Sequence, residues 1–454
     1  MNDPRKFWNP IINDFQPLVT AEPGWVDQFY VDRASGDPTN STLELLKEGL
    51  LTSLERPTPY RALLTGHRGA GKSFELIKLG GALAEDFFVV RFDAEITLAP
   101  ETANHFDIIL GMGIAVFAQA QLAHLKPDPK LAEALLKSLA RFIRKYEDRK
   151  GFKLNLTDIL KQVTAGLVKF GALAAGDPTA IVAAAAFEAT RLELNVSDEH
   201  VRTLELPPNR FEVIGALNNI IEWVQGACGK RVLLIVDGLD KVTPPRARLL
   251  FADTSLLRDP ICSLIYAAPI VFYHRAAAWQ AEQIFDAYEM LPNVPVQKQL
   301  PRDKQWLEPR EPSERGLDVM REVVKLRLAR HELLVDDVIA PEAMTLLAQM
   351  SGGVMRTLIL LFNTAATFAK MKGQDRIDHD LAEKSVIKQR NDLQIRLNLD
   401  LRKALENVLK ERMLLGGTSE QAEDELLIND YLLSYRDEVA WFDVHPNVLP
   451  LLRS

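Results

Sequence analysis

The sequence predicts an α/β protein built on a doubly wound parallel sheet, followed by an all-α region and a small C-terminal domain. Two observations lead to this prediction. Over the first 300 residues, short apolar runs alternate with helical patterns, as is typical of parallel βαβ units. The first of these runs passes directly into a glycine-rich loop, "GHRGAGKS", and then into a helical pattern.

Five apolar or aromatic runs are expected to form the strands of this sheet. They are residues 60–65, 86–95, 231–237, 262–273 and 289–297. The third, "RVLLIVD", is apolar almost throughout, as in a strand buried on both faces. The fifth contains two prolines and is therefore expected near a sheet edge. The leucine spacing of "STLELLKEGLLTSL" predicts a helix before the first strand, and residues 74–85 are expected to form the helix after the loop.

At 454 residues the chain is long enough for about three domains. The predicted parts are an N-terminal arm and helix at 1–55, a core at 56–300 with a helical insertion at about 105–205, a helical lid at 316–390 and a C-terminal domain at 391–454. A charged, proline-containing stretch at 300–316 is expected to be a linker. The C-terminal domain is expected to hold two helices and a β-hairpin around the polar turn Arg436-Asp437-Glu438.

The helical insertion contains an alanine-rich run at 167–189 that admits three interpretations. It could be a membrane segment, a tightly packed helical hairpin or an oligomer contact. A membrane segment is disfavoured, because Lys169, Asp177 and Pro178 interrupt the run and leave each half too short to span a bilayer.

Composition makes several classes of partner and site less favourable without excluding nucleic acid, since a local basic patch could still bind it. The formal net charge of −8 gives no general attraction to nucleic acid or to anionic lipid. Cys228 and Cys262 lie in or beside apolar stretches, which fits a reducing compartment and predicts no disulfide framework. The first residues lack the apolar run of a signal peptide, so a cytoplasmic location is expected. The scattered histidines predict no histidine-based metal site.

The glycine-rich loop fits the phosphate-binding pattern of Gly, four residues, Gly, Lys and then Ser or Thr. Its backbone N–H groups and the following helix N-terminus are suited to phosphate oxygens. Lys72 is expected at the β- and γ-phosphates of ATP, and the Ser73 hydroxyl on Mg²⁺. The predicted nucleotide-binding residues are Gly66, Gly69, Gly71, Lys72, Ser73 and Phe74. His67 and Arg68 occupy variable positions and are interpreted as merely tolerated there.

The strand 231–237 ends in Asp237, which is expected to come from the strand neighbouring the loop strand and to bind Mg²⁺ with Ser73. The next residue is Gly238, where many ATPases of this general type carry a glutamate that activates water. Asp240 from the same turn, or Glu95 or Asp93 from another strand tip, could replace it. Slow turnover is therefore expected.

The order of these parts resembles the AAA+/STAND branch of P-loop ATPases, and most closely the origin-recognition-type initiators. "DGLDK" is similar to the second motif of NACHT-like signalling ATPases, and residues 391–454 look like a winged-helix domain. "SGGVMR" looks like the start of a sensor-2 helix, which implies that Arg356 faces the γ-phosphate.

Two expected features of that resemblance have no clear counterpart. The first sensor of these ATPases is usually a polar residue at the tip of the fourth strand, and here only Tyr266 or His274 could replace it. Candidate arginine fingers are Arg246, Arg258 and Arg275, and none can be singled out.

Two classes of function remain open. One is an ATP-binding, slowly hydrolysing regulatory switch that acts through a separate protein partner, and the resemblance implies a bacterial defence or mobile-element system. The other is a DNA-handling ATPase that places its winged helix on DNA. Residues 391–454 hold seven Lys or Arg and twelve Asp or Glu, so DNA is disfavoured. ATP, Mg²⁺ and a homo-oligomer are expected, and a membrane is not.

Overall fold

The protein was analysed as a computed structural model, and the structure divides into two compact units. It describes residues 4–16, 23–33, 39, 41–97, 103–126, 128, 130, 131, 134, 210–275, 280–414, 420–437 and 439–453. We call Leu43–Thr65 with Glu75–Glu289 the sheet unit. The helical unit comprises Met1–Thr42, Gly66–Phe74 and Met290–Ser454. The phosphate loop thus packs with the helical unit, although it follows a strand of the sheet.

The sheet unit holds a five-stranded sheet in the order β2-β3-β4-β1-β5. The strands are β1 (Arg61–Thr65), β2 (Phe87–Asp93), β3 (Arg231–Asp237), β4 (Ser263–Ala267) and β5 (Ala287–Met290). The pairs β2/β3, β3/β4 and β4/β1 are parallel, which confirms the predicted sheet. One detail of the prediction is wrong: β3 is not the neighbour of the loop strand, because β4 lies between them.

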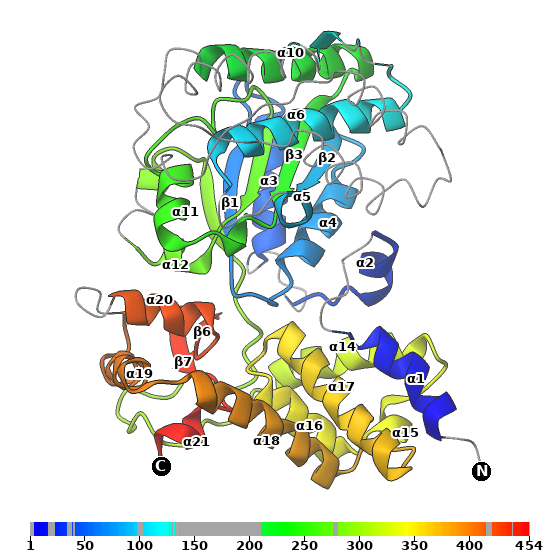
Figure 1. Cartoon of the computed structure of the whole chain (residues 1–454), viewed down its shortest axis with the longest axis vertical. Helices are drawn as coiled ribbons and strands as arrows, with labels where there is room; N and C mark the ends of the chain where they lie inside the picture. Colours follow the sequence, from blue (N-terminus) through cyan, green and yellow to red (C-terminus); the bar gives the residue numbers. More distant parts are fainter. Residues whose placement is uncertain are drawn as a thin grey trace, which may run out of the picture. The chain divides into compact units, whose positions relative to one another are not determined.

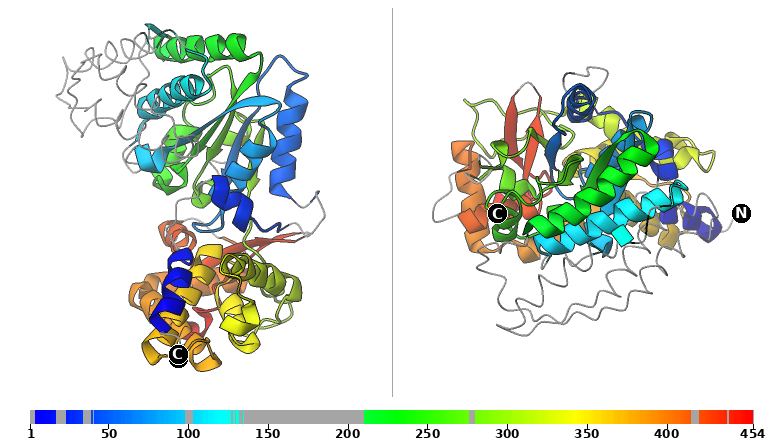
Figure 2. Two further views of the ribbon diagram at one scale, coloured as in Figure 1. Left: turned by 90° about the vertical axis from the view of Figure 1, so that its right-hand side faces the viewer. Right: turned by 90° about the horizontal axis from the view of Figure 1, so that it is seen from above.

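Helices cover both faces of this sheet (Figures 1 and 2). The helices of the sheet unit include α3 (Thr42–Ser53), α4 (Lys72–Ala82), α5 (Ala94–Thr97), α6 (His105–Leu122), α10 (Arg210–Cys228), α11 (Pro244–Phe251) and α12 (Ile270–Tyr273). Gly80 of α4 lies against Val89 of β2, whereas Gly111 of α6 lies against the ring of Phe92 of β2. Since residues 89 and 92 point to opposite faces of a strand, α4 and α6 sandwich the sheet. The doubly wound prediction is therefore confirmed.

Helix α6 is long and apolar enough to cross a membrane, the one such helix among the described residues. However, 72% of its most apolar window is buried inside the protein. It packs against β2, β3 and α10, as the core helix of a sheet layer does. Most of the insertion beyond α6, including the alanine-rich run 167–189, lies outside the described residues.

Two of the predicted strands extend beyond the observed ones. The run 262–273 was expected to be one strand, but β4 ends at Ala267 and α12 begins at Ile270. Pro269 separates them as the N-cap of α12, because proline has no N–H for a ladder and suits a helix start. β5 lies at the predicted edge but precedes both prolines of 289–297.

The lid of the helical unit is all-α, as predicted. Its helices are α14 (Glu314–Ala329), α15 (Val335–Val338), α16 (Pro341–Met350), α17 (Met355–Lys372) and α18 (His379–Arg396). They enclose a core of small and aliphatic side chains, in which Ala365, Ala366 and Ala369 allow close helix approach. Helix α18 runs across residues 390 and 391, so the lid and the C-terminal domain share it.

The N-terminal arm is part of this lid rather than a polar appendage. Helix α1 (Pro4–Asp14) buries Trp8 and Ile11 in the lid core together with Phe15. The ring of Phe15 stacks on Phe362 of α17 with centroids 4.0 Å apart. The Trp8 indole N–H donates to the carbonyl of Gln374 at 2.7 Å. A second short helix, α2 (Pro23–Phe29), also contacts α14.

The C-terminal segment contains helices and one hairpin in the predicted order. Its elements are α19 (Leu399–Glu411), α20 (Glu420–Ile428), β6 (Leu432–Arg436), β7 (Ala440–Val444) and α21 (Leu449–Leu452). The hairpin is antiparallel and pairs Arg436 with Ala440, so the predicted hairpin is present, while Glu438 of its turn lies outside the described residues. Tyr435 stacks on Trp441 across the two strands with centroids 4.5 Å apart.

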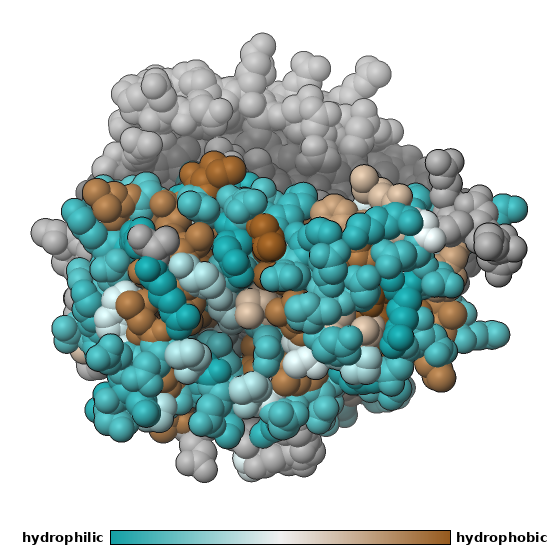
Figure 3. All heavy atoms as spheres, turned by 90° about the horizontal axis from the view of Figure 1, so that it is seen from below, coloured by the Kyte–Doolittle hydropathy of each residue, from teal (hydrophilic) through white to brown (hydrophobic). Residues whose placement is uncertain are grey.

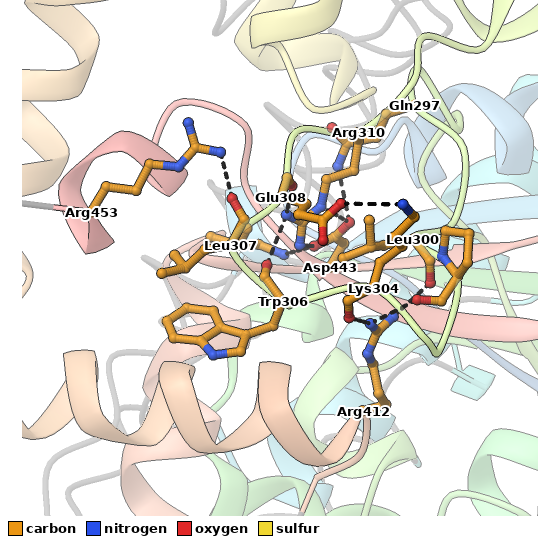
Figure 4. A network of polar contacts seen from close by, with 12 residues as sticks. Gln297, Leu300, Lys304, Trp306, Leu307, Glu308, Arg310, Arg412, Asp443 and Arg453 are labelled. Carbon is orange, nitrogen blue, oxygen red and sulfur yellow. Dashed lines mark hydrogen bonds and ion pairs between the residues drawn. The ribbon is translucent and has the colours of Figure 1, made fainter.

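The predicted linker at 300–316 is firmly attached to this C-terminal segment (Figure 4). The guanidinium of Arg310 binds both carboxylate oxygens of Asp443, at 2.8 and 2.6 Å, and both side chains are only 3% exposed. Arg412, at the end of α19, donates to the carbonyl of Leu300 at 2.6 Å. Charged residues of the predicted linker therefore make specific contacts with the C-terminal segment, of which the Arg310–Asp443 pair is buried.

Candidate nucleotide-binding site

The phosphate loop lies between β1 and α4, the context its pattern requires. Lys72, the first residue of α4, is 5% exposed and folds back over the loop. Its ammonium donates to the carbonyls of Gly66 at 2.9 Å and His67 at 3.0 Å. These donors are the ones that phosphate oxygens would attract, because charge-assisted bonds to phosphate are stronger than bonds to a carbonyl. The loop can therefore exchange internal bonds for ligand bonds.

The lid reaches the loop through Arg356. Its backbone N–H donates to the carbonyl of Gly69 at 3.2 Å from the first turn of α17. Gly69 has a φ of 81°, and a Cβ there would overlap the Cβ of Arg356. Glycine is thus required at 69 both by its backbone conformation and by the lid. Arg356 lies beside the loop, and its predicted role toward the γ-phosphate stays a prediction.

A second arginine, Arg33, lies at the loop and was not among the residues predicted from the sequence. Arg33 follows α2 and donates to the carbonyl of Ala70, and also to that of Pro292 at 3.3 Å. Its guanidinium lies so close to Gly71 that a Cβ there would overlap it. No motif surrounds Arg33 in the sequence, so nothing local could have placed it there.

His67, interpreted from sequence as merely tolerated, makes specific contacts with the C-terminal segment. Its side chain is fully buried. The backbone N–H of Ser434 in β6 donates to its Nε2 at 2.9 Å. Because Nε2 must then be unprotonated, Nδ1 carries the hydrogen and donates to the Asp430 carboxylate at 2.9 Å. His67 is therefore a neutral bridge between the loop and the hairpin.

A second buried histidine lies near this bridge. His445 follows β7, and its Nδ1 accepts a hydrogen bond from the backbone N–H of Asn447 at 3.1 Å. Burial lowers the pKa of His445 to about 4, against the opposing effect of the Asp430 carboxylate. The surroundings of His67 thus hold a neutral second imidazole at neutral pH.

The sheet unit presents acidic side chains at the carboxyl ends of two strands. Asp93 and Asp237 are register partners at the ends of β2 and β3. One oxygen of Asp237 accepts from the N–H of Gly238, and one of Asp93 from the N–H of Glu95, both at 2.8 Å. A carboxylate at this edge is suited to Mg²⁺, which takes one or two protein carboxylates together with phosphates.

The glycine at 238 has a physical cause. Its φ is 82°, and a Cβ there would stand 2.6 Å from the Glu95 nitrogen and 2.9 Å from an Asp93 oxygen. A glutamate cannot occupy this position without moving β2. Any side chain at 238 would therefore clash with the ends of β2 and α5 as they lie in this structure.

The alternative candidate bases differ in their surroundings. Glu95 forms an ion pair with Lys241. Asp240 lies in the short 3-10 helix Leu239–Lys241 that follows β3. Among the described residues, no group of three or more His, Cys, Asp or Glu side chains could hold a metal ion by itself. The carboxylates of Asp93 and Asp237 are oxygen ligands of the kind that Mg²⁺ takes in proteins.

Tyr266, one of the two substitutes for the first sensor, is a core residue. Its side chain is fully buried, and its hydroxyl donates to the carbonyl of Leu257 at 2.7 Å. Burial raises its pKa well above the usual value. Among the finger candidates, Arg258 donates within the sheet unit to the carbonyl of Ile284 at 3.3 Å.

Comparison with known families shows what most of the sheet unit is similar to. The family model described as "KAP family P-loop domain" matches residues 44–267, a range that contains the loop and Asp237. Residues 44–267 are thus similar to a KAP family P-loop domain. Together with the phosphate loop between β1 and α4, this similarity bears out the predicted P-loop ATPase. No curated protein gives a significant match.

Three of the solved structures to which this chain is similar share 15% or less of its sequence. Cdc6p from Pyrobaculum aerophilum is 12% identical, with 97% of this chain and 95% of that chain covered and a TM-score of 0.40. ORC2 from Aeropyrum pernix, in ADPNP–ADP complexes, is 15% identical over 90% and 91%, with a TM-score of 0.39. The RuvB Holliday junction branch migration motor from Thermotoga maritima is 11% identical over 91% and 94%, with a TM-score of 0.36.

Proposed function

We propose that the protein is an ATP-binding, slowly hydrolysing switch in which the nucleotide at the loop controls the C-terminal hairpin. The observation that supports this most is the contact of His67 with Ser434 and Asp430. One loop residue offers its carbonyl to Lys72 and its ring to the hairpin. A ligand that rearranges the loop backbone would therefore act on both bonds at once.

The switching free energy would come from the difference in phosphate contacts between two states of the loop. When phosphates draw Lys72 away, the carbonyls of Gly66 and His67 lose their ammonium donor. The loop must then move to satisfy them, and His67 moves with it. In this proposal ATP and ADP differ in how far Lys72 and Arg356 are engaged, and Ser73 and Asp237 hold Mg²⁺.

Slow turnover follows from the surroundings of the strand tips. Gly238 leaves no room for a glutamate, and Lys241 neutralises Glu95. A long-lived ATP state suits a protein that signals with its conformation rather than one that performs repeated work.

A separate protein is the proposed receiver of the signal, in a bacterial defence or mobile-element system as the family resemblance implies. The C-terminal segment carries a net charge of −5, which opposes contact with a nucleic acid backbone. On the face of the molecule drawn in Figure 3, hydrophilic residues dominate and apolar residues lie scattered between them. A partner is therefore expected to recognise charge more than a continuous apolar patch.

Hydrogen exchange of residues 431–444 tests the proposal. We expect ATP with Mg²⁺ to change amide protection of β6 in the wild-type protein, and no change in Lys72→Ala. ATP binding that leaves the protection of β6 unchanged would contradict the switch. Tight, salt-dependent binding of duplex DNA that is lost in Arg436→Glu would support the alternative of a DNA-handling ATPase.

A further inference from the structure

The linker and the end of α19 line a half-open pocket of about 630 Å³ that the nucleotide switch does not use. Pockets of this size are common for small ligands. Its walls are formed by Arg302, Lys304, Gln305, Trp306, Leu307, Lys410, Glu411, Arg412 and Met413. Figure 4 shows several of these residues on the linker, with α19 running alongside.

The pocket walls are held in place by arginines that bind backbone carbonyls. Arg412 has a φ of 60° at the C-cap of α19 and donates to the carbonyls of Leu300, Pro301 and Lys304. Arg310 donates to the carbonyl of Trp306 at 2.9 Å. Because these bonds fix the linker on both sides of Trp306, the pocket is pre-formed rather than shaped by a ligand.

The pocket is positively charged on an acidic protein. Four of its lining residues are cationic and only Glu411 is anionic, whereas the whole chain carries −8. Lys304 lies 3.8 Å from Glu308 and Lys410 lies 3.9 Å from Glu406, and both lysine side chains are about half exposed. Such long, solvated ion pairs are weak, so both ammonium groups can turn to an anionic ligand.

Trp306 adds an aromatic surface to this charge. The indole is half-buried, and the Lys410 ammonium lies 5.5 Å from its ring centroid. A planar base stacks on an aromatic ring regardless of base identity, and nearby lysines or arginines bind the attached phosphate. A tryptophan among cations is thus suited to a ligand that joins a ring to a phosphate.

We propose that this pocket binds one nucleoside phosphate unit, with its base on Trp306 and its phosphate on Lys304, Lys410 and Arg302. The unit can come from a free nucleotide or from the end of a single strand, since both present the same chemistry. The site belongs to the linker and α19, and it does not depend on the nucleotide switch at the loop.

Binding is tested in full-length protein carrying Lys72→Ala, so that the loop does not contribute. The probes are AMP, a 5′-phosphorylated hexathymidylate and inorganic phosphate. Titration calorimetry at two salt concentrations measures the affinity of each. We expect Lys304→Ala/Lys410→Ala to lower the affinity for AMP or the oligonucleotide at least tenfold and to flatten the salt dependence. Trp306→Ala should lower it at least fivefold, while Trp306→Phe retains most of it.

The matched control is Lys325→Ala/Lys388→Ala, which removes two exposed lysines from ion pairs on α14 and α18. It should bind like the parent, and thermal unfolding should be unchanged in every variant compared. If AMP binds as tightly as the oligonucleotide, the source of the unit is a free nucleotide. If the oligonucleotide binds much more tightly than AMP, the source is the end of a single strand. Equal affinities of the pocket and control variants, or binding unaffected by Trp306→Ala, would overturn the proposal.

Discussion

The backbone N–H of Ser434 donates a hydrogen bond to Nε2 of His67, 367 residues earlier in the chain. The bond joins a phosphate loop to a C-terminal hairpin inside one compact unit. Its geometry also fixes the proton of the imidazole on Nδ1, facing Asp430. Any change of charge on this ring would therefore remove the acceptor that the hairpin uses.

His67→Ala is expected to release the hairpin from the loop. Ser434 is 2% exposed, and a buried N–H left without an acceptor costs about 1–3 kcal/mol. We expect faster hydrogen exchange at Ser434 and its neighbours in β6. Asp430→Asn keeps a carbonyl acceptor for Nδ1–H and should change the exchange much less. Equal exchange in His67→Ala and wild type would show that the bond does not hold the hairpin.

Lys72→Ala is expected to lower ATP affinity at least tenfold. A single charge-assisted hydrogen bond contributes about 1.5–3 kcal/mol, and the ammonium can make more than one to phosphate. Calorimetric titration measures the loss. Lys388→Ala, an exposed lysine of α18, is the matched control and should bind ATP as the wild type does. Unchanged ATP affinity in Lys72→Ala would exclude the loop as the nucleotide site.

Gly238→Glu is expected not to accelerate ATP hydrolysis, although it introduces the glutamate of faster ATPases. The left-handed backbone at 238 disfavours any side chain by about 1–2 kcal/mol, and the contact with Glu95 adds to this. Thermal unfolding and phosphate release measure both effects. Gly238→Ala should be destabilised similarly, which separates backbone strain from charge. Faster release in Gly238→Glu would mean that the strand ends can move apart.

The helical unit is expected to lose stability on acidification because of His445. Its pKa is about 4 in the folded protein against 6.5 when exposed, so the unfolded chain binds the proton first. Stability is therefore full above pH 6.5 and falls by about 3 kcal/mol as the pH drops to 4. Hydrogen exchange in β6 and β7 between pH 7 and 5, corrected for intrinsic rates, measures this. His445→Asn should reduce the dependence.

The sheet unit provides an internal comparison. Burial lowers the pKa of His105 to about 4, but burial also raises the pKa of Asp107 to about 6. Acidification lowers the stability through His105, because its folded pKa lies below the unfolded value. It raises the stability through Asp107, because the folded pKa of Asp107 lies above the unfolded value. The core around α6 should thus respond less to acid than the hairpin does. A larger response of α6 would contradict the opposing contributions.

Arg310→Met is expected to destabilise the helical unit by about 3–5 kcal/mol, since it leaves the buried carboxylate of Asp443 without its cation. The double variant Arg310→Met/Asp443→Leu should be less destabilised than the single one. Chemical unfolding followed by circular dichroism compares them. Arg321→Met breaks an exposed ion pair with Asp336 and serves as the control, with a loss below about 1 kcal/mol. Equal losses in the two single variants would contradict a buried role for Arg310.

Local signals in the sequence predicted the features that depend on neighbours in the chain. The glycine spacing of the loop and the apolar run of β3 led directly to Lys72 and Asp237 at their observed element ends. The hairpin turn was predicted from three polar residues between two apolar runs. The strand predicted at 262–273 was too long because Pro269 was overlooked. This proline lies between the end of β4 and the start of α12.

Contacts between distant segments could not be predicted in the same way. The partners of His67 and Arg33 lie far away in sequence, and neither residue stands in a pattern that indicates a partner. The order of the strands is likewise a property of the assembled sheet. The placement of α1 in the lid had a detectable signal: Trp8, Ile11 and Phe15 recur at helical spacing, but the prolines around them suggested an arm.

The close approach of Gly69 to Arg356 has a consequence for how this chain can change over evolutionary time. Because the loop glycine leaves room for a lid residue as well as for phosphate, substitutions at the two positions should be inherited together. A variant at 69 cannot then be interpreted as a pure loss of nucleotide binding, since it also displaces the lid. Homologues that have lost the phosphate-binding lysine should still retain this glycine wherever they retain the lid.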